Sequence, residues 1–131
     1  MKVGFTGTQQ GMTPFQLTDF EGWVLGREIS EFHHGDCIGA DEQAVMIVRT
    51  VQPNAKLVCH PPVNESKRAF AESDVYLPPK EYLDRNHDIV DAVHQMVACP
   101  KGKHEEQRSG TWATIRYASK RGGLLYIIWP Y

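Results

Sequence analysis

The sequence predicts a single α/β domain of three layers, in which helices cover both faces of a parallel sheet of five strands. Short apolar stretches alternate with segments of helical periodicity along the 131 residues. This alternation is typical of parallel strands joined by right-handed helical crossovers. The last apolar stretch, 124–129, is almost continuously apolar, as expected for a strand that is covered on both faces.

The expected elements follow one another in a regular order. The five strands are expected at 2–6, 31–34, 57–59, 96–99 and 124–129, with the spatial order 3-2-1-4-5. Helices are expected at about 14–29, 40–50, 79–95 and 109–121. Thr13, Pro14 and Gln16 have the spacing of a capping box at the start of the first helix. Asp41 suits the first turn of the second helix, and Gly122 suits the end of the fourth.

One segment does not fit the alternation. Residues 60–78 are long, bounded by prolines and mixed in composition. Because a connection of this length seldom serves only as a linker, we expect it to form a partly ordered cap near the ligand crevice.

The composition narrows the class of protein. The formal net charge is −2, so duplex nucleic acid is not an expected partner. Three widely spaced cysteines predict reduced thiols rather than a zinc site or disulfides, and no cofactor or metal is expected. The chain begins directly on a strand and has no apolar run of membrane-spanning length. We therefore expect a cytoplasmic protein without a membrane partner.

Three glycine-containing loops follow expected strands and precede expected helices. They are 7–11, 35–41 and 100–111. In an open parallel sheet such loops meet at the carboxyl ends of the strands, where ligands bind. The spacing matches neither G-x-G-x-x-G nor the P-loop, which argues against a dinucleotide dehydrogenase or a P-loop NTPase. Ser109, Gly110 and Thr111 open a helix and would suit a phosphate.

Four segments of the sequence stand out in their order and spacing: GFTGT, HHGDCIGADEQA, DRNHDIVDAVHQMVACP and SGTWATIRYASKRGG. Together they resemble the SLOG superfamily, the Rossmann-like domains named for the Smf/DprA and Lonely Guy proteins. The resemblance covers most of the chain in order and is weakest at 60–78. It implies a nucleotide or nucleotide-derived ligand, and it is nearest to small stand-alone prokaryotic or viral members.

The Lonely Guy signature P-G-G-x-G-T-x-x-E is matched in part. The resemblance places Pro100 at its proline and Gly110-Thr111 at its G-T, with an expanded gap between them. Arg85 resembles the arginine of the preceding helix and would clamp a phosphate. The position of the catalytic glutamate is occupied by Thr114. Because a hydroxyl is a poor base at neutral pH, the Lonely Guy mechanism is not expected, and no catalytic residue is assigned.

The candidate ligand-binding residues come from the loops and from the third helix. Asp36 and Asp41 are candidates for binding ribose hydroxyls, with helix capping as the alternative for Asp41. The full set is Gly7, Thr8, Gly35, Asp36, Gly39, Ala40, Asp41, Arg85, Asn86, Pro100, Ser109, Gly110 and Thr111.

The leading functional hypothesis is binding of a nucleotide-like small molecule, as a sensor, a carrier or a sequestering protein. The first alternative is an N-glycosidic hydrolase or transferase that acts on nucleoside monophosphates. The second is an interaction protein whose glycine loops are purely structural. Four aromatic residues, Trp112, Tyr117, Trp129 and Tyr131, exceed the needs of a small core and predict a homodimer or higher homo-oligomer.

Overall fold

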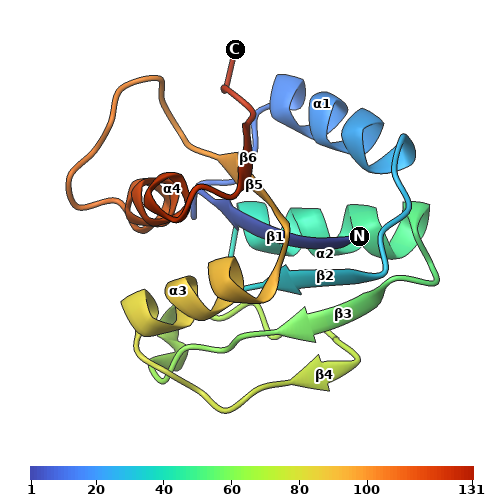
Figure 1. Cartoon of the computed structure of the whole chain (residues 1–131), viewed down its shortest axis with the longest axis horizontal. Helices are drawn as coiled ribbons and strands as arrows, with labels where there is room; N and C mark the ends of the chain where they lie inside the picture. The colour runs from blue at the N-terminus through green and yellow to red at the C-terminus, as the bar shows by residue number, and fades with distance from the viewer.

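The computed structural model describes all residues from 1 to 131, and its sheet is entirely parallel (Figure 1). The strands are β1 (Lys2–Gly7), β2 (Glu31–His34), β3 (Lys56–Cys59), β4 (Val75–Tyr76), β5 (Gln95–Cys99) and β6 (Leu124–Ile127). Their spatial order is β4-β3-β2-β1-β5-β6. The predicted three-layer α/β architecture and the relative order of the five predicted strands are confirmed.

The predicted number of strands is wrong, because the sheet has six. The additional strand, β4, lies within the segment 60–78 and pairs with β3, placing Val75 beside Val58 and Tyr76 beside Cys59. With only two residues, β4 is too short to produce an alternating pattern in the sequence. Its pairing with β3 defines it, and this pairing is a long-range contact.

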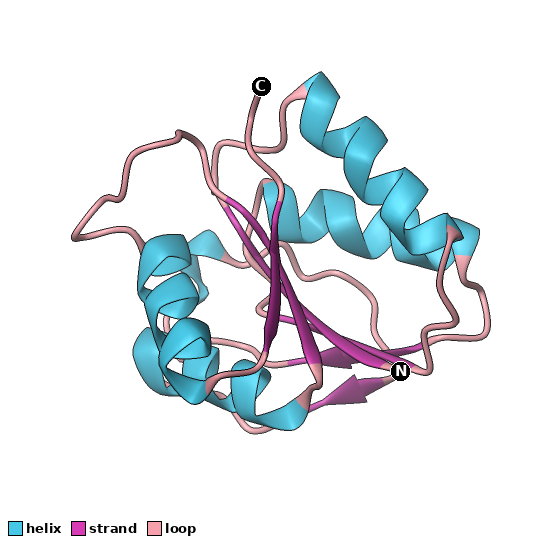
Figure 2. Cartoon of the chain, turned by 45° about the horizontal axis from the view of Figure 1, so that its top comes forward, coloured by secondary structure: helices cyan, strands magenta, loops and turns pink.

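The helices cover the two faces of the sheet in pairs. They are α1 (Pro14–Leu25), α2 (Ala40–Val51), α3 (Tyr82–Ala92) and α4 (Gly110–Arg121). The pair α1 and α2 packs on one face, and α3 and α4 pack on the other (Figure 2). All four are too short to cross a bilayer.

The predicted capping box at the start of α1 is present. Thr13 Oγ1 accepts a hydrogen bond from Gln16 N at 3.1 Å, and Gln16 Oε1 accepts one from Thr13 N at 3.0 Å. The Gln16 amide nitrogen also donates to the carbonyls of Pro100 and Ile128, each at 2.8 Å. This buried side chain therefore joins the start of α1 to the loop after β5.

Two helices are shorter than predicted. Helix α1 ends at Leu25 rather than near residue 29. Gly26 is its C-cap, and Gln52 Nε2 donates a hydrogen bond to the carbonyl oxygen of Val24 at 2.9 Å. Helix α3 begins at Tyr82 rather than at residue 79, because Lys80 forms an isolated parallel β-bridge with Pro62. Helix α4 ends as predicted, with Gly122 in the left-handed region at φ 73°.

The core has a larger part and a smaller part on opposite sides of the sheet. The larger part lies under α1 and α2, where the rings of Phe5, Phe20 and Phe32 pack together. The smaller part lies under α3 and α4 and includes Ile89 and Trp112. Trp112 is therefore a core residue rather than a free aromatic surface.

Candidate functional site

A cavity of about 920 Å³ lies at the carboxyl ends of the strands. Residues of all three glycine-containing loops line it, together with α3 and part of the segment 60–78. Its volume falls within the range of small-molecule sites. Nine of the predicted ligand-binding residues line this cavity: Gly7, Thr8, Gly35, Asp41, Arg85, Asn86, Ser109, Gly110 and Thr111.

The other four predicted residues, Asp36, Gly39, Ala40 and Pro100, do not line the cavity. Ala40 N donates to the carbonyl of Thr8 at 3.0 Å, and Pro100 accepts from Gln16. Gly39 has φ 87°, and a Cβ there would lie 2.3 Å from the carbonyl oxygen of Gln9. Gly39, Ala40 and Pro100 thus hold the loops against one another, outside the cavity lining.

Asp36 has a structural role that the sequence did not indicate. Its side chain is fully buried, and its two carboxylate oxygens accept from Arg68 Nε and Ala71 N, each at 2.8 Å. Both partners belong to the segment 60–78. Asp36 thus ties this segment to the loop after β2, and because it is fully buried and does not line the cavity, it is not placed to take a ribose hydroxyl.

The start of α4 offers unpaired hydrogen-bond donors to the cavity. Ser109 Oγ accepts from Trp112 N at 3.2 Å and caps the helix. The backbone N–H groups of Gly110 and Thr111 have no partner, and neither does the Thr111 hydroxyl. No acidic residue lies in the first turn. The positive end of the helix dipole is therefore uncompensated at the cavity wall.

The start of α2 differs in this respect. Its first turn carries Asp41 and Glu42, whose negative charges compensate the helix dipole. Asp41 Oδ2 accepts from Cys37 N at 3.2 Å. An anion at this edge of the sheet therefore finds a more favourable place at α4 than at α2.

Thr114 is unsuited to replace a catalytic glutamate. Its side chain is buried, and its hydroxyl donates to the carbonyl of Gly110 at 2.9 Å, within α4. The geometry thus agrees with the sequence-based expectation that this position supplies no general base.

Asp41 is the buried carboxylate of the cavity wall. Burial raises its pKa to about 6, while the positive charge of Arg85 and the bond from Cys37 act in the opposite direction. A carboxyl group with a pKa near neutrality exchanges its proton readily in the pH range where enzymes work. Asp41 therefore has the properties of a general acid or base.

Arg85 lines the cavity, and its side chain is buried. Its guanidinium lies among backbone carbonyls: Nη1 donates to the carbonyl of Gly35 and to that of His60, the latter at 3.1 Å. It forms no ion pair with a carboxylate. The positive charge of Arg85 therefore contributes to the electrostatic potential of the cavity.

Several lining residues were not among the sequence-based candidates. Tyr82 and Leu83, at the start of α3, provide an aromatic and an apolar surface. Lys67, from the segment 60–78, and Arg108, from the loop before α4, are cations without an ion-pair partner. The basic residues of these two segments were the one signal in the sequence that could have indicated these cations. The side of the cavity on which each of them lies depends on the fold.

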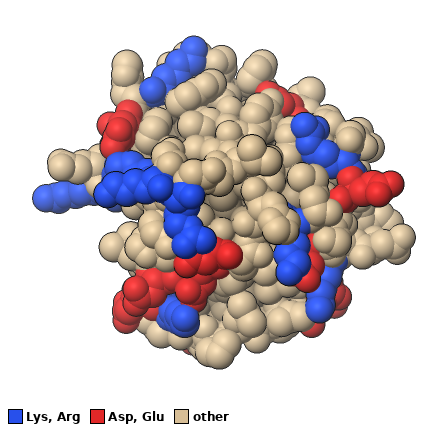
Figure 3. All heavy atoms as spheres, viewed as in Figure 1, with Lys and Arg blue, Asp and Glu red and all other residues tan.

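The charged surface is uneven around α4. In Figure 3, which has the view of Figure 1, Lys and Arg side chains gather on the side of α4, and acidic side chains gather toward α3. Two of the basic residues are neutralised by neighbours: Lys101 lies 3.5 Å from Glu106, and Arg116 lies 2.6 Å from Glu105. Lys67 and Arg108 are thus cations of the cavity without an ion-pair partner, in addition to the buried Arg85.

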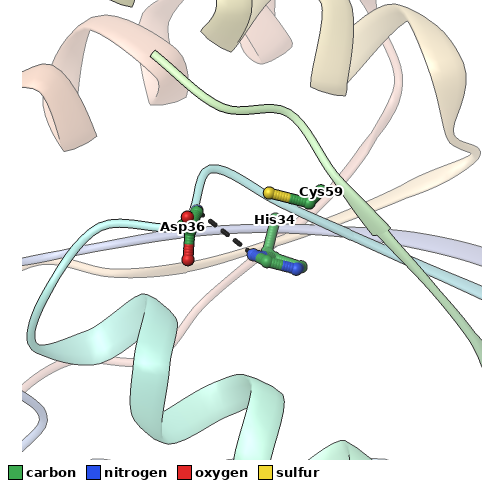
Figure 4. Close-up of side chains that lie close together, drawn as sticks. All are labelled: His34, Asp36 and Cys59. Atoms are coloured by element: carbon green, nitrogen blue, oxygen red, sulfur yellow. Dashed lines mark hydrogen bonds between the residues drawn. The ribbon is translucent and has the colours of Figure 1, made fainter. Parts of the chain in front are cut away.

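His34, Asp36 and Cys59 lie close together beneath the loop after β2 (Figure 4). Their potential ligand atoms lie within 4.8 Å of one another. However, His34 Nδ1 accepts from Asp36 N at 3.1 Å, and both Asp36 oxygens are bound as described above. Burial also raises the pKa of Cys59 to about 12, which disfavours the thiolate. The donor atoms are engaged within the protein, and the cluster is poorly suited to a metal ion.

The fold is similar to two solved structures. The molybdenum cofactor binding protein from the phototrophic bacterium Rippkaea orientalis is 20% identical, with a TM-score of 0.70 over 97% of this chain and 76% of that chain. The structural genomics target TM1055 is 17% identical, with a TM-score of 0.67 over 95% of this chain and 72% of that chain. At these identities the likeness shows a shared Rossmann-like fold. No protein-family model and no curated protein matches the sequence.

Proposed function

We propose that the protein binds a phosphorylated, nucleotide-like small molecule in the cavity at the carboxyl edge of the sheet. The observation that carries this proposal is the pair of unpaired N–H groups at Gly110 and Thr111, on the wall of a cavity of ligand size. Backbone N–H groups and a helix dipole that converge on one point form a natural seat for a phosphate.

The rest of the cavity suits the remainder of a nucleotide. Tyr82 and Leu83 offer a surface against which a planar heterocycle stacks. Lys67 and Arg108 add positive charge that attracts an anion. The resemblance to SLOG proteins favours a nucleotide, and the similar fold of a molybdenum cofactor binding protein favours a small-molecule ligand in general.

A substitution at Gly110 tests the phosphate seat. A Cβ at this position would have only Asn86 Nδ2 nearby, at 3.9 Å, so a side chain fits there. In Gly110→Asp a carboxylate takes the place of the phosphate, while an acid in the first turn also suits the helix. We expect the variant to fold and to bind nucleoside monophosphates at least about ten- to a hundredfold more weakly than the wild type.

Gly110→Asn is the matched control, because it adds a side chain of the same size without the charge. Titration calorimetry should show a clearly smaller loss for this variant than for Gly110→Asp. Equal affinities of both variants and the wild type would refute the phosphate seat. Absence of any binding in a thermal-shift panel of nucleotides would instead favour the interaction protein.

The second candidate function is hydrolysis or transfer at the N-glycosidic bond of a nucleoside monophosphate. Asp41 favours it, because a buried carboxyl group with a pKa of about 6 on the cavity wall can exchange a proton with a leaving base. Chromatography of wild-type protein incubated with nucleoside monophosphates would detect the free base. Release of base that disappears in Asp41→Asn would establish the enzyme, and no release would leave a binding protein.

A further inference from the structure

We infer that Asn86, held in one orientation by Arg85, is the side chain that distinguishes a phosphorylated ligand from its dephosphorylated form. Arg85 then acts as a positioning residue rather than as the phosphate clamp that the sequence suggested. This inference rests on the proposed function, since it assigns the roles of two residues in the same cavity.

The hydrogen bonds of Arg85 leave too few donors for a clamp. A guanidinium has five N–H groups, and a bidentate contact with phosphate uses two of them side by side. Nε donates to Asn86 Oδ1 at 2.8 Å, and Nη1 donates to the carbonyls of Gly35 and His60. Nη2 donates to Cys37 Sγ at 3.7 Å, so a single Nη2 hydrogen remains free. Each side-by-side pair includes a nitrogen that is already engaged by the protein.

The bond from Arg85 also decides which way the Asn86 amide faces. Arg85 Nε–H is a donor only, so the oxygen of the amide must turn toward it. The amide nitrogen then faces the other way, and it lies 3.9 Å from the position that a Cβ on Gly110 would take. Nδ2 has no hydrogen-bond partner in the protein, and Asn86 lines the cavity.

The unpaired Nδ2 therefore lies near Gly110, the residue that carries the first of the two free N–H groups at the start of α4. Together the three groups provide donors from two helices, α3 and α4, to one anion. When a nucleoside without phosphate binds, water forms hydrogen bonds with these donors instead. The donors then lose little free energy, because they are open to the cavity. The preference for a phosphorylated ligand over its nucleoside thus depends on a neutral amide whose orientation is fixed by the charged side chain of Arg85.

Asn86→Asp tests the role of the amide. One carboxylate oxygen still accepts from Arg85 Nε, whereas the other places a negative acceptor where the donor was. We expect the variant to bind nucleoside 5′-monophosphates about ten- to a hundredfold more weakly, with the affinity for the matching nucleosides nearly unchanged. The probes are AMP, GMP, CMP and UMP with their nucleosides, measured by titration calorimetry. Asn54→Asp is the control, because it adds the same charge at an exposed site between α2 and β3.

Arg85→Lys tests the positioning role, because lysine keeps the positive charge but lacks the Nε–H that orients the amide. We expect it to lose selectivity for the phosphorylated form as Asn86→Asp does. The double variant should lose no more affinity for the monophosphates than Asn86→Asp alone, since both changes remove the same oriented amide. Losses that multiply in the double variant would show that Arg85 contacts the phosphate directly and would overturn the inference.

The outcomes separate this inference from the function on which it rests. If wild-type protein binds the monophosphates and Asn86→Asp keeps the full preference over nucleosides, the inference fails and the proposed function stands. If wild-type protein binds none of the probes, the proposed function fails and the inference falls with it. Near-ultraviolet circular dichroism of each variant verifies that the compared proteins are folded.

Discussion

The guanidinium of Arg85 packs directly on the backbone of Gly35. Nη1 donates to the carbonyl of this glycine, and a Cβ added to Gly35 would lie 2.6 Å from the same nitrogen. A side chain at this position would thus force the Arg85 guanidinium to move away from Gly35. The contact joins α3 to the loop after β2, and both line the cavity.

Gly35→Ala should therefore displace Arg85. We expect a loss of about 1–3 kcal/mol in the free energy of unfolding, the usual cost of overpacking a buried site. Urea denaturation measures this loss, and nucleotide binding should weaken as well. Gly102→Ala is the control, because a Cβ at Gly102 meets nothing within 4 Å. Equal stabilities of the two variants would contradict the packing of Arg85 on Gly35.

The stability of the protein should decrease in mild acid because of buried histidines. His33 Nδ1 lies 2.8 Å from His60 Nε2, and His33 Nε2 lies 2.8 Å from Glu31 Oε1, an arrangement that uses neutral rings. Burial lowers the pKa of His34 to about 4 and that of His60 to about 3, and it also lowers the pKa of His33. The unfolded chain therefore takes up protons below about pH 6.5, where the folded chain does not.

It follows that the free energy of unfolding is unaffected by these histidines above pH 6.5 and falls between pH 6.5 and about 4. Asp41 acts in the opposite direction, because its raised pKa favours the folded state as the pH falls from 6 toward 3.8. Three histidines outweigh one carboxyl, so a net loss is expected in denaturation curves recorded at several pH values. His60→Gln should flatten the dependence, and the exposed His104→Gln should leave it unchanged. A stability that is constant from pH 7 to 4.5 would contradict the assignment.

Asp36→Asn should loosen the segment 60–78. The new amide nitrogen would face either Arg68 Nε or Ala71 N, and both are donors. We expect a loss of about 1–3 kcal/mol in stability, the cost of unsatisfied buried donors, and faster amide hydrogen exchange within 60–78. Glu65→Gln removes only an exposed contact with Arg68 at 3.7 Å and should have little effect. Unchanged exchange in Asp36→Asn would contradict the role of Asp36 in holding the segment.

The expected self-association is tested by Leu124. Strand β6 is an edge of the sheet, and Leu124 at its start is 64% exposed. If copies of the chain associate along this side, light scattering at micromolar concentration gives a mass above that of one chain. Leu124→Glu should then reduce the mass, because a charge opposes pairing at a sheet edge. A monomeric mass for the wild type would refute the expected oligomer.

The sequence by itself determined the architecture. Apolar stretches separated by helical segments define the strands and helices, and the handedness of crossovers restricts their order. The capping box at Thr13 and Gln16 and the stop at Gly122 are local signals, and the structure confirms them. These features depend on residues only a few positions apart, so they can be recognised without the fold.

The tertiary structure decided what each polar residue near the cavity does. Asp36, in the loop after β2, and Asp41, in the first turn of α2, are only five positions apart, yet one holds the segment 60–78 while the other lines the cavity. The resemblance implies that Arg85 clamps a phosphate, whereas in the structure its guanidinium donates to carbonyls contributed by residues 35 and 60. Strand β4 likewise exists through its pairing with β3. The partners of these groups are distant in the chain, and only folding places a buried donor beside the acceptor that it requires.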